Sequence, residues 1–366
     1  MWLFWIACTP NVPVESAVDT DEVASVDTDA AFEPTAVGTV SGSATWQVDF
    51  SAAAEAAGYV DCDYSRAWSN GLEDQSAPWL CPTCGPRLWR VDAAVVSGRE
   101  ACYDRISANA PAEVEWLGVA DGAFYRANRL NLRLSEQGAV AGDDAAATLV
   151  NDTDFQFQDA SGATFDATFH IEGALAFGTA TGDPAWGMRP PTAYACGWPK
   201  RDRAAYAGDY RLDLGAPLPD GVFTDACGDP VRLDDLGGEW LVVDVAARDC
   251  GPCRVMAEGA NAFVAGMAAK GVKVRTVTLL APTLSDTLAI TPTEQLVEWA
   301  DGYALTDPVL ADRGYGVWVM GEAAPRVSGE DFGYPTWAVV GPDGNVRALH
   351  VGFGSWDAVA AVVDAG

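Results

Sequence analysis

Two cysteines, Cys250 and Cys253, have the spacing best suited to chemistry in this 366-residue chain. Gly251 and Pro252 lie between them, within the segment VVDVAARDCGPCRVMAE. Two thiols at this spacing can form a structural disulfide, supply half of a metal site, or act as a redox centre that exchanges electrons with another pair of thiols. The sequence on either side of the pair helps to distinguish these possibilities.

The pair is expected where a buried strand gives way to a helix. Residues 239–247, EWLVVDVAA, are apolar and β-branched, which is typical of a strand buried on both faces. After Pro252 the apolar residues follow the helical period up to a Lys-Gly pair at 270–271. Cys250 would then lie at a helix N-terminus, which favours a thiolate, and Cys253, one turn further on, suits a resolving thiol. The apolar face of this helix is expected to contain Val255, Met256, Phe263, Val264 and Met267.

The rest of the carboxyl-terminal third continues to alternate between strand and helix patterns. Residues 218–238, before the cysteines, are expected to form a short hairpin, and VKVRTVTLL, after the first helix, predicts a second buried strand. A helix then begins with Thr291 as its N-cap, and Glu294 completes a capping box. The chain ends in a hairpin that turns at 343–344 and a helix capped by Ser355.

This order of elements resembles the thioredoxin fold, most closely redoxins of the TlpA type, over about residues 215–366. CGPC is the form of the motif found in thioredoxins. Asp244, six residues before Cys250, matches the buried acid that relays the proton of the resolving thiol in that family. Tyr334-Pro335-Thr336, before a strand, matches the loop with a cis-proline that lies against the cysteines and binds extended substrate.

The resemblance implies a thiol–disulfide oxidoreductase with no cofactor or metal beyond its own disulfide. A thiolate at Cys250 would attack a substrate disulfide, Cys253 would resolve the mixed disulfide, and Asp244 would accept a proton. The implied partners are proteins with thiols or disulfides and a membrane electron donor or acceptor. The residues expected to contact substrate are Gly251, Pro252, Tyr334 and Pro335.

The motif departs from the family pattern just before the first cysteine. Asp249 stands where the family usually has Trp, and a carboxylate there opposes formation of a thiolate at Cys250. Arg248 and Arg254 are expected to lie near enough to offset this charge. If Asp249 dominates, the reduced form is less stabilised and the couple is more reducing.

Two other functions fit the same residues. A binding protein could use a redoxin scaffold whose Cys250–Cys253 disulfide is an inert structural link. A thiol peroxidase is the lesser alternative, because peroxiredoxins share this fold but need Thr or Ser three residues before the peroxidatic cysteine. Ala247 occupies that position before Cys250.

Six further cysteines suggest an oxidising compartment. Cys62, Cys81, Cys84 and Cys102 permit two structural disulfides, a zinc site, or a second redox pair at Cys81 and Cys84. Disulfides are the preferred interpretation, because the remaining two cysteines of a zinc site would stand alone and Gly-Pro after Cys84 leaves no supporting helix. A disulfide that joins the two domains is expected between the remaining pair, Cys196 and Cys227.

The amino terminus, MWLFWIACTP, resembles a bacterial lipoprotein signal, although no Lys or Arg precedes its short apolar run. The resemblance implies that residues 1–8 end at a lipidated Cys8, which would anchor the chain to a lipid bilayer. In that family an Asp after the lipidated cysteine retains the protein in the inner membrane, but here Thr9 follows Cys8. The resemblance therefore implies that the chain is anchored to the outer membrane of the cell envelope and faces the periplasm. Residues 9–38 contain seven acids and no basic residue and are expected to form a disordered tether.

Between the tether and the redoxin-like domain, residues 39–205 mostly alternate with the period of a β-strand. They predict an antiparallel sandwich or barrel of unknown role, and residues 206–366 complete the chain as an α/β thioredoxin-like domain. The formal charge of −30 argues against nucleic acid as a partner. The chain has only two histidines, His170 and His350, which disfavours hydrolases and metal sites that depend on histidine.

Overall fold

The computed structural model describes residues 35–366, except for 75–77, 82, 85–86, 107–112, 129–130, 159–161, 183–189, 202–205, 207, 209 and 286–289. Cys8, the expected signal at 1–8 and most of the expected tether lie outside the described residues. Within the described part of the chain, no helix combines the length and apolarity needed to cross a membrane.

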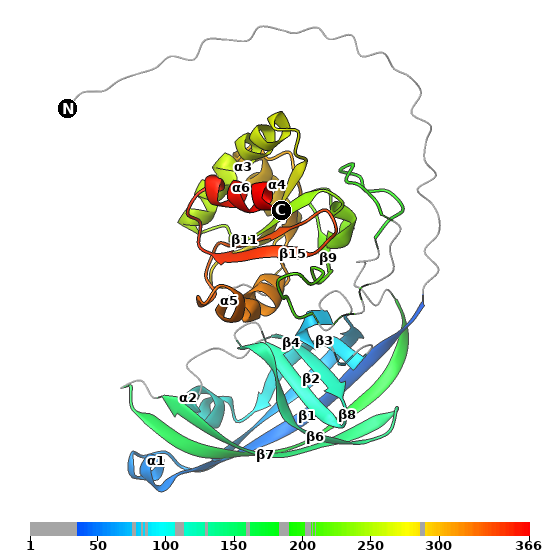
Figure 1. The fold of residues 1–366 in the computed structure, drawn as a ribbon. Coiled ribbons are helices and arrows are strands. Elements are labelled where there is room, and N and C mark those ends of the chain that lie inside the picture. Colours follow the sequence, from blue (N-terminus) through cyan, green and yellow to red (C-terminus); the bar gives the residue numbers. More distant parts are fainter. Residues whose placement is uncertain are drawn as a thin grey trace, which may run out of the picture. The chain divides into compact units, whose positions relative to one another are not determined.

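The amino-terminal domain is a closed, eight-stranded antiparallel barrel, in keeping with the predicted mostly-β domain (Figure 1). Each strand pairs with the next along the chain, and β1 closes the barrel by pairing with β8. The first strand begins at Thr35, before the expected boundary at residue 39. The strands are β1 (Thr35–Phe50), β2 (Cys62–Glu73), β3 (Leu88–Ser97), β4 (Val114–Ala120), β5 (Ala123–Asn128), β6 (Asn131–Gly142), β7 (Ala146–Gln158) and β8 (Thr164–Gly182).

The barrel interior contains aromatic residues and a buried charged group. Trp46, Trp68 and Phe124 are among its largest buried side chains. The Glu115 carboxylate is fully buried and lies 2.8 Å from the guanidinium of Arg66, while the indole N–H of Trp68 donates to it over 2.7 Å. An eight-stranded barrel is just wide enough to be filled by side chains, as this core is. The short helix α1 (Ala52–Ala56) follows its N-cap, Ser51, whose hydroxyl accepts the backbone N–H of Ala54.

The carboxyl-terminal domain is built on a five-stranded sheet of order β13-β12-β11-β14-β15 (Figure 1). The central strand β11 runs parallel to β12 and antiparallel to β14, and all of its residues are buried, as expected for EWLVVDVAA. A small hairpin of β9 (Val222–Thr224) and β10 (Pro230–Arg232) precedes it. The sheet strands are β11 (Trp240–Ala247), β12 (Val274–Ala281), β13 (Val309–Ala311), β14 (Thr336–Val340) and β15 (Val346–Val351).

Helices cover both faces of this sheet. Val242 of β11 packs with Met256 and Phe263 of α3 and with Val359 of α6 on one face. Because successive side chains of a strand point to opposite faces, Val245 lies on the other face of the sheet. There it packs with η5 (Gly316–Met320) and α5 (Gly321–Val327). The remaining helices are α2 (Asp104–Ile106), α3 (Gly251–Ala269), α4 (Thr293–Gly302) and α6 (Trp356–Ala365), and short 3₁₀ and π turns are η1 (Pro78–Leu80), η3 (Arg99–Tyr103) and η4 (Leu233–Leu236).

Two details predicted from the sequence are wrong. Thr291 is not the N-cap of α4, because its hydroxyl donates to the carbonyl of Leu280 at the end of β12, and Pro292 takes the cap position. Val255 does not belong to the buried face of α3, since its side chain is 56 % exposed. By contrast, α3 ends at the expected Lys270, and α6 begins after the expected cap, Ser355.

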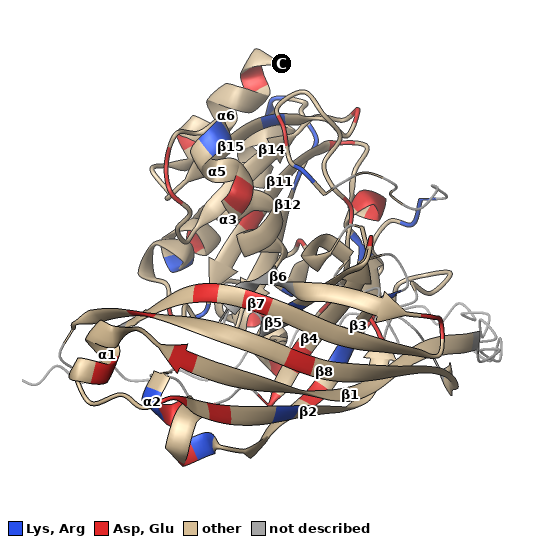
Figure 2. Cartoon of the chain, turned by 90° about the horizontal axis from the view of Figure 1, so that it is seen from below, with Lys and Arg blue, Asp and Glu red and all other residues tan. Residues whose placement is uncertain are grey.

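Acidic residues occur on the barrel strands and on the carboxyl-terminal domain (Figure 2). The two histidines lie in strands. His170 of β8 lies 2.7 Å from Asp152 and 3.1 Å from Asp49, and His350 of β15 stacks on Trp337. These contacts give both histidines partners within the sheets.

Candidate active site

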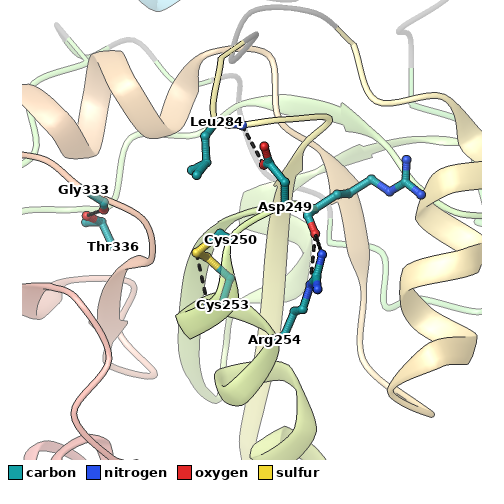
Figure 3. Close-up of a disulfide and its surroundings, with 8 residues drawn as sticks. Asp249, Cys250, Cys253, Arg254, Leu284, Gly333 and Thr336 are labelled. Carbon is teal, nitrogen blue, oxygen red and sulfur yellow. Dashed lines mark hydrogen bonds between the residues drawn. A yellow bond between two sulfur atoms is a disulfide. The ribbon is translucent and has the colours of Figure 1, made fainter.

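Cys250 and Cys253 form a disulfide at the N-terminus of α3 (Figure 3). A tight turn leads from β11 to the helix, closed by the N–H of Cys250 donating to the carbonyl of Ala247 over 3.0 Å. Cys250 is the N-cap, and the backbone N–H of Cys253 points at its sulfur over 3.2 Å. A sulfur that accepts an N–H at the positive end of a helix is stabilised as a thiolate when the disulfide opens.

The disulfide is covered by small apolar residues, but one side of its motif is open. Cys250 is 3 % exposed and Cys253 is fully buried. Both belong to a cluster that includes Ala246, Ala247, Ala257 and Leu280. Gly251 and Pro252, between the cysteines, are exposed. A partner can therefore approach over the Gly-Pro turn.

Asp244 lies in the middle of the sheet, between Thr278 of β12 and Trp337 of β14. Its side chain lies on the same face of β11 as those of Val242 and Ala246, the face that α3 covers. It is 4 % exposed, and its Oδ1 has no hydrogen-bond partner among the described residues. Burial alone raises the pKa of Asp244 to about 8.

The Tyr334–Pro335 peptide bond is cis, and the loop that contains it faces the disulfide. Figure 3 shows Gly333 and Thr336 across from the two cysteines, and the Thr336 hydroxyl donates to the Gly333 carbonyl over 2.6 Å. The N–H of Gly352 donates to the carbonyl of Pro335 over 2.7 Å. Tyr334 packs against the cluster that contains both cysteines. The structure thus brings together the cysteines and the proline loop that the sequence singled out.

Each of the three charged residues near the motif has a hydrogen-bond or ion-pair partner. The Asp249 carboxylate accepts the backbone N–H of Leu284 over 2.8 Å (Figure 3). Arg248 instead forms an ion pair with Glu298 over 2.8 Å, and Arg254 donates to the backbone carbonyl of Arg248. No hydrogen bond or ion pair joins Asp249 to either arginine in the described part of the chain, and the bond to its carboxylate comes from the backbone of Leu284.

Two residues near the sheet ends were missed by sequence reasoning. Leu284, in the loop after β12, is 47 % exposed and adds an apolar side chain beside the motif. Asp312, directly after β13, is fully buried, and burial raises its pKa to about 7. Asp312 lies by Val245, on the face of the sheet opposite Asp244. The only signal for Asp312 in the sequence is that an acid directly follows a short apolar strand. That strand, β13, has three residues and is too short to be predicted from its pattern.

The remaining six described cysteines form three disulfides: Cys62–Cys102, Cys81–Cys84 and Cys196–Cys227. In this form the sulfurs of the barrel are not thiolates and do not have the charge that a zinc site requires. The Cys81–Cys84 pair is buried, at 6 % and 4 % exposed, and lies in a turn after η1 instead of at a helix N-terminus.

Residues 214–349 match the family model described as the AhpC/TSA family. Together with the sheet order and the CGPC motif at the start of α3, this match defines the carboxyl-terminal part of the chain as a redoxin domain with a thioredoxin-like fold. No match was found among curated proteins.

Solved structures similar to the chain include a putative thiol:disulfide interchange protein DsbE from Chlorobium tepidum, with 26 % identity and a TM-score of 0.32 over 42 % of this chain and 97 % of that one. The exposed lipoprotein thioredoxin Etrx1 from Streptococcus pneumoniae has 20 % identity and a TM-score of 0.31 over 40 % and 99 %. A DsbF homologue from Corynebacterium diphtheriae has 16 % identity and a TM-score of 0.32 over 46 % and 99 %.

Proposed function

We propose that the redoxin domain is a thiol–disulfide oxidoreductase that exchanges disulfides with other proteins through Cys250 and Cys253. The observation that carries this proposal is the N–H of Cys253 directed at the Cys250 sulfur over 3.2 Å at the start of α3. This donor and the helix dipole lower the energy of a Cys250 thiolate, which is the form that attacks disulfides.

The exchange has two steps. The Cys250 thiolate attacks one sulfur of a substrate disulfide, forms a mixed disulfide, and releases the other substrate sulfur as a thiolate. Cys253 then attacks the Cys250 sulfur, closes the Cys250–Cys253 disulfide, and releases the second substrate thiolate. The substrate gains two electrons that the cysteine pair loses, and the reverse sequence oxidises a substrate dithiol.

Asp244 is suited to take the proton of Cys253 during the second step. A thiol has an ordinary pKa of about 8.5, and proton transfer is most effective between groups of similar pKa. Burial raises the pKa of Asp244 to about 8, and its Oδ1 lacks a partner in the described structure. Asp244 would therefore exchange a proton with Cys253 near neutral pH.

The surface around the motif is suited to an extended polypeptide. Gly251 and Pro252 are exposed, and the Tyr334–Pro335 loop lies against the same cluster as the cysteines. Leu284 adds an exposed apolar side chain beside Asp249. We propose that substrate backbone lies along the proline loop while an apolar side chain of the substrate contacts Leu284.

We also propose that the chain works in a bacterial cell envelope, anchored to the outer membrane through a lipid on Cys8 and facing the periplasm. The motif around Cys8 and the number of disulfides support this placement. A membrane protein would then supply or accept the electrons. Mass spectrometry of the chain expressed in a bacterium, compared with Cys8→Ala, should detect diacylglycerol on Cys8; an unmodified Cys8 would refute the anchor.

The reduction potential of Cys250–Cys253 in the full chain tests the oxidoreductase. The chain is equilibrated with mixtures of reduced and oxidised dithiothreitol that set a series of redox potentials. Differential alkylation followed by mass spectrometry then reports the oxidation state of each cysteine pair separately. We expect reduction of Cys250–Cys253 at a potential between about −270 and −120 mV, the range of working redoxins. A pair that resists reduction below about −300 mV would indicate an inert structural link. The buried Cys81–Cys84 pair provides the control in the same sample.

A further inference from the structure

A second group of potential ligands surrounds the Cys196–Cys227 disulfide, away from the CGPC motif. The two sulfurs and a carboxylate oxygen of Asp225 all lie within 4.8 Å of one another. Asp225 directly follows β9, and Cys227 lies in the turn between β9 and β10. The oxidised sulfurs are neutral, so the group has no use as a metal site until the disulfide opens.

The Asp225 carboxylate is held in a fixed position. Its side chain is fully buried, and its Oδ1 accepts the backbone N–H groups of Cys227 and Asp229 over 2.9 and 2.8 Å. Its Oδ2 accepts the indole N–H of Trp198 over 2.7 Å, which leaves a lone pair on that oxygen. A ligand that is already oriented loses little freedom when it binds a cation.

The two segments that contain the cysteines are also held together without the disulfide. The N–H of Ala195, the residue before Cys196, donates to the carboxylate of Asp229, two residues after Cys227. The hydroxyl of Tyr194 donates to Asp235 over 2.6 Å and accepts the N–H of Arg232 over 3.1 Å. Opening the disulfide should therefore leave the two sulfurs close to Asp225.

This disulfide is more accessible than those of the barrel. Cys227 is exposed and Cys196 is half-buried, whereas Cys81, Cys84 and Cys102 are at most 6 % exposed. A dithiol can therefore reach the Cys227 sulfur in the folded chain, while each barrel disulfide has at least one sulfur that is shielded.

We propose that reduction of Cys196–Cys227 creates a binding site for a thiophilic divalent cation such as Zn²⁺, with Cys196, Cys227 and Asp225 as ligands. A dithiol reductant supplies two electrons and two protons, opens the disulfide, and itself becomes a disulfide. The cation then displaces one proton from each thiol. Two thiolates and one carboxylate match the ligands that Zn²⁺ prefers and leave a fourth position open.

Charge explains why the reduced group would select a cation. Two thiolates and a carboxylate within 4.8 Å repel one another, and partial burial strengthens the repulsion. A divalent cation removes the repulsion, whereas reoxidation removes the ligands.

Cobalt binding to the full chain with Cys8→Ser, Cys250→Ser and Cys253→Ser tests the proposal without the thiols of the CGPC motif. The chain is reduced with a phosphine, desalted without oxygen, and alkylated in a parallel sample to verify that only Cys196 and Cys227 are free. Titration with Co²⁺ should give thiolate-to-cobalt absorption that saturates at one ion per chain, and Zn²⁺ should displace it. The oxidised chain should show no such absorption.

Two substitutions distinguish a ligand from an unrelated acid. Asp225→Asn should weaken Zn²⁺ binding by about tenfold or more, while the control Asp301→Asn, at an exposed acid of α4 outside this group, should retain it. An unchanged affinity in Asp225→Asn, or full cobalt absorption in a Cys227→Ser variant, would overturn the proposal. So would a disulfide that stays closed in the folded chain, or loss of near-ultraviolet circular dichroism on reduction, because the site requires both an open disulfide and a folded turn.

Discussion

Leu284 donates its backbone N–H to the Asp249 carboxylate over 2.8 Å, although 35 residues separate the two in sequence. The bond connects the loop after β12 to the residue just before Cys250. It holds the carboxylate of the residue before Cys250 with a backbone donor. The effect of Asp249 on the cysteine pair is therefore open to a direct test.

Replacing Asp249 with Asn should make the Cys250–Cys253 couple more oxidising. The substitution removes a negative charge near Cys250, so the thiolate of the reduced form becomes more stable. We expect the reduction potential to rise by about 10 to 30 mV in dithiothreitol equilibration. Glu258→Gln, which removes an exposed carboxylate further along α3, serves as the control. Equal potentials for the wild type and Asp249→Asn would show that the Leu284 donor already neutralises the effect.

Replacing Asp244 with Asn should slow resolution of the mixed disulfide by about 100-fold near pH 7, because Cys253 loses its proton acceptor. The rate is measured by acid-quenched mass spectrometry of the complex between reduced protein and a disulfide peptide. The initial attack by Cys250 should be unchanged. Asp343→Asn, at an exposed turn, is the control, and equal resolution rates in all three proteins would exclude Asp244 from the proton transfer.

The same substitution should stabilise the oxidised protein at neutral pH. Burial raises the pKa of Asp244 from its ordinary value of 3.8 to about 8 in the folded chain. Between pH 4 and pH 8, folding is therefore accompanied by binding of a proton to this carboxylate. The stability of the wild type therefore decreases as pH rises from about 4 to about 8. At pH 7 we expect the free energy of unfolding of Asp244→Asn to exceed that of the wild type by about 2–4 kcal/mol. Urea denaturation from pH 4 to 8 checks this, and a difference that does not grow with pH would contradict it.

Replacing Glu115 with Gln should destabilise the barrel by about 3 kcal/mol, because two arginines lose a buried counter-ion. Arg66 and Arg126 lie 2.8 and 3.1 Å from the same Glu115 oxygen, and the glutamate is fully buried. Denaturation followed by tryptophan fluorescence measures the loss. Glu172→Gln, an exposed residue of β8, should leave the midpoint unchanged. A Glu115→Gln midpoint equal to that of the control would mean that the pair adds nothing to stability.

Local patterns were sufficient to predict the elements around the cysteines. The all-buried strand β11, the helix after Pro252 and the cap at Ser355 each follow from consecutive residues, and the structure confirms them. Thr291 was assigned wrongly because its hydroxyl is used by Leu280, eleven residues earlier, in a contact that no local rule contains. The three-residue strand β13 carries too short a pattern to be recognised.

Contacts between distant residues account for the rest. The period of two predicted strands over the amino-terminal domain, but a sandwich and a barrel share that period. What distinguishes them is the pairing of β1 with β8, which joins Thr35 to Gly182. The bond between Asp249 and Leu284 is similar in kind, since nothing in the segment around either residue indicates the other. The candidate site was therefore predictable in its main residues but not in its surroundings.

The closure of the barrel also determines how the domain would respond to a pulling force. The strand nearest the amino terminus among the described residues, β1, pairs with β8 along its length on one side and with β2 from Thr39 to Val48 on the other. Both neighbours are antiparallel, so tension applied along β1 from residue 35 would shear two ladders at once instead of unzipping one bond at a time. The first strand is therefore a mechanical clamp, placed where any tension transmitted through the amino-terminal segment would enter the folded domain.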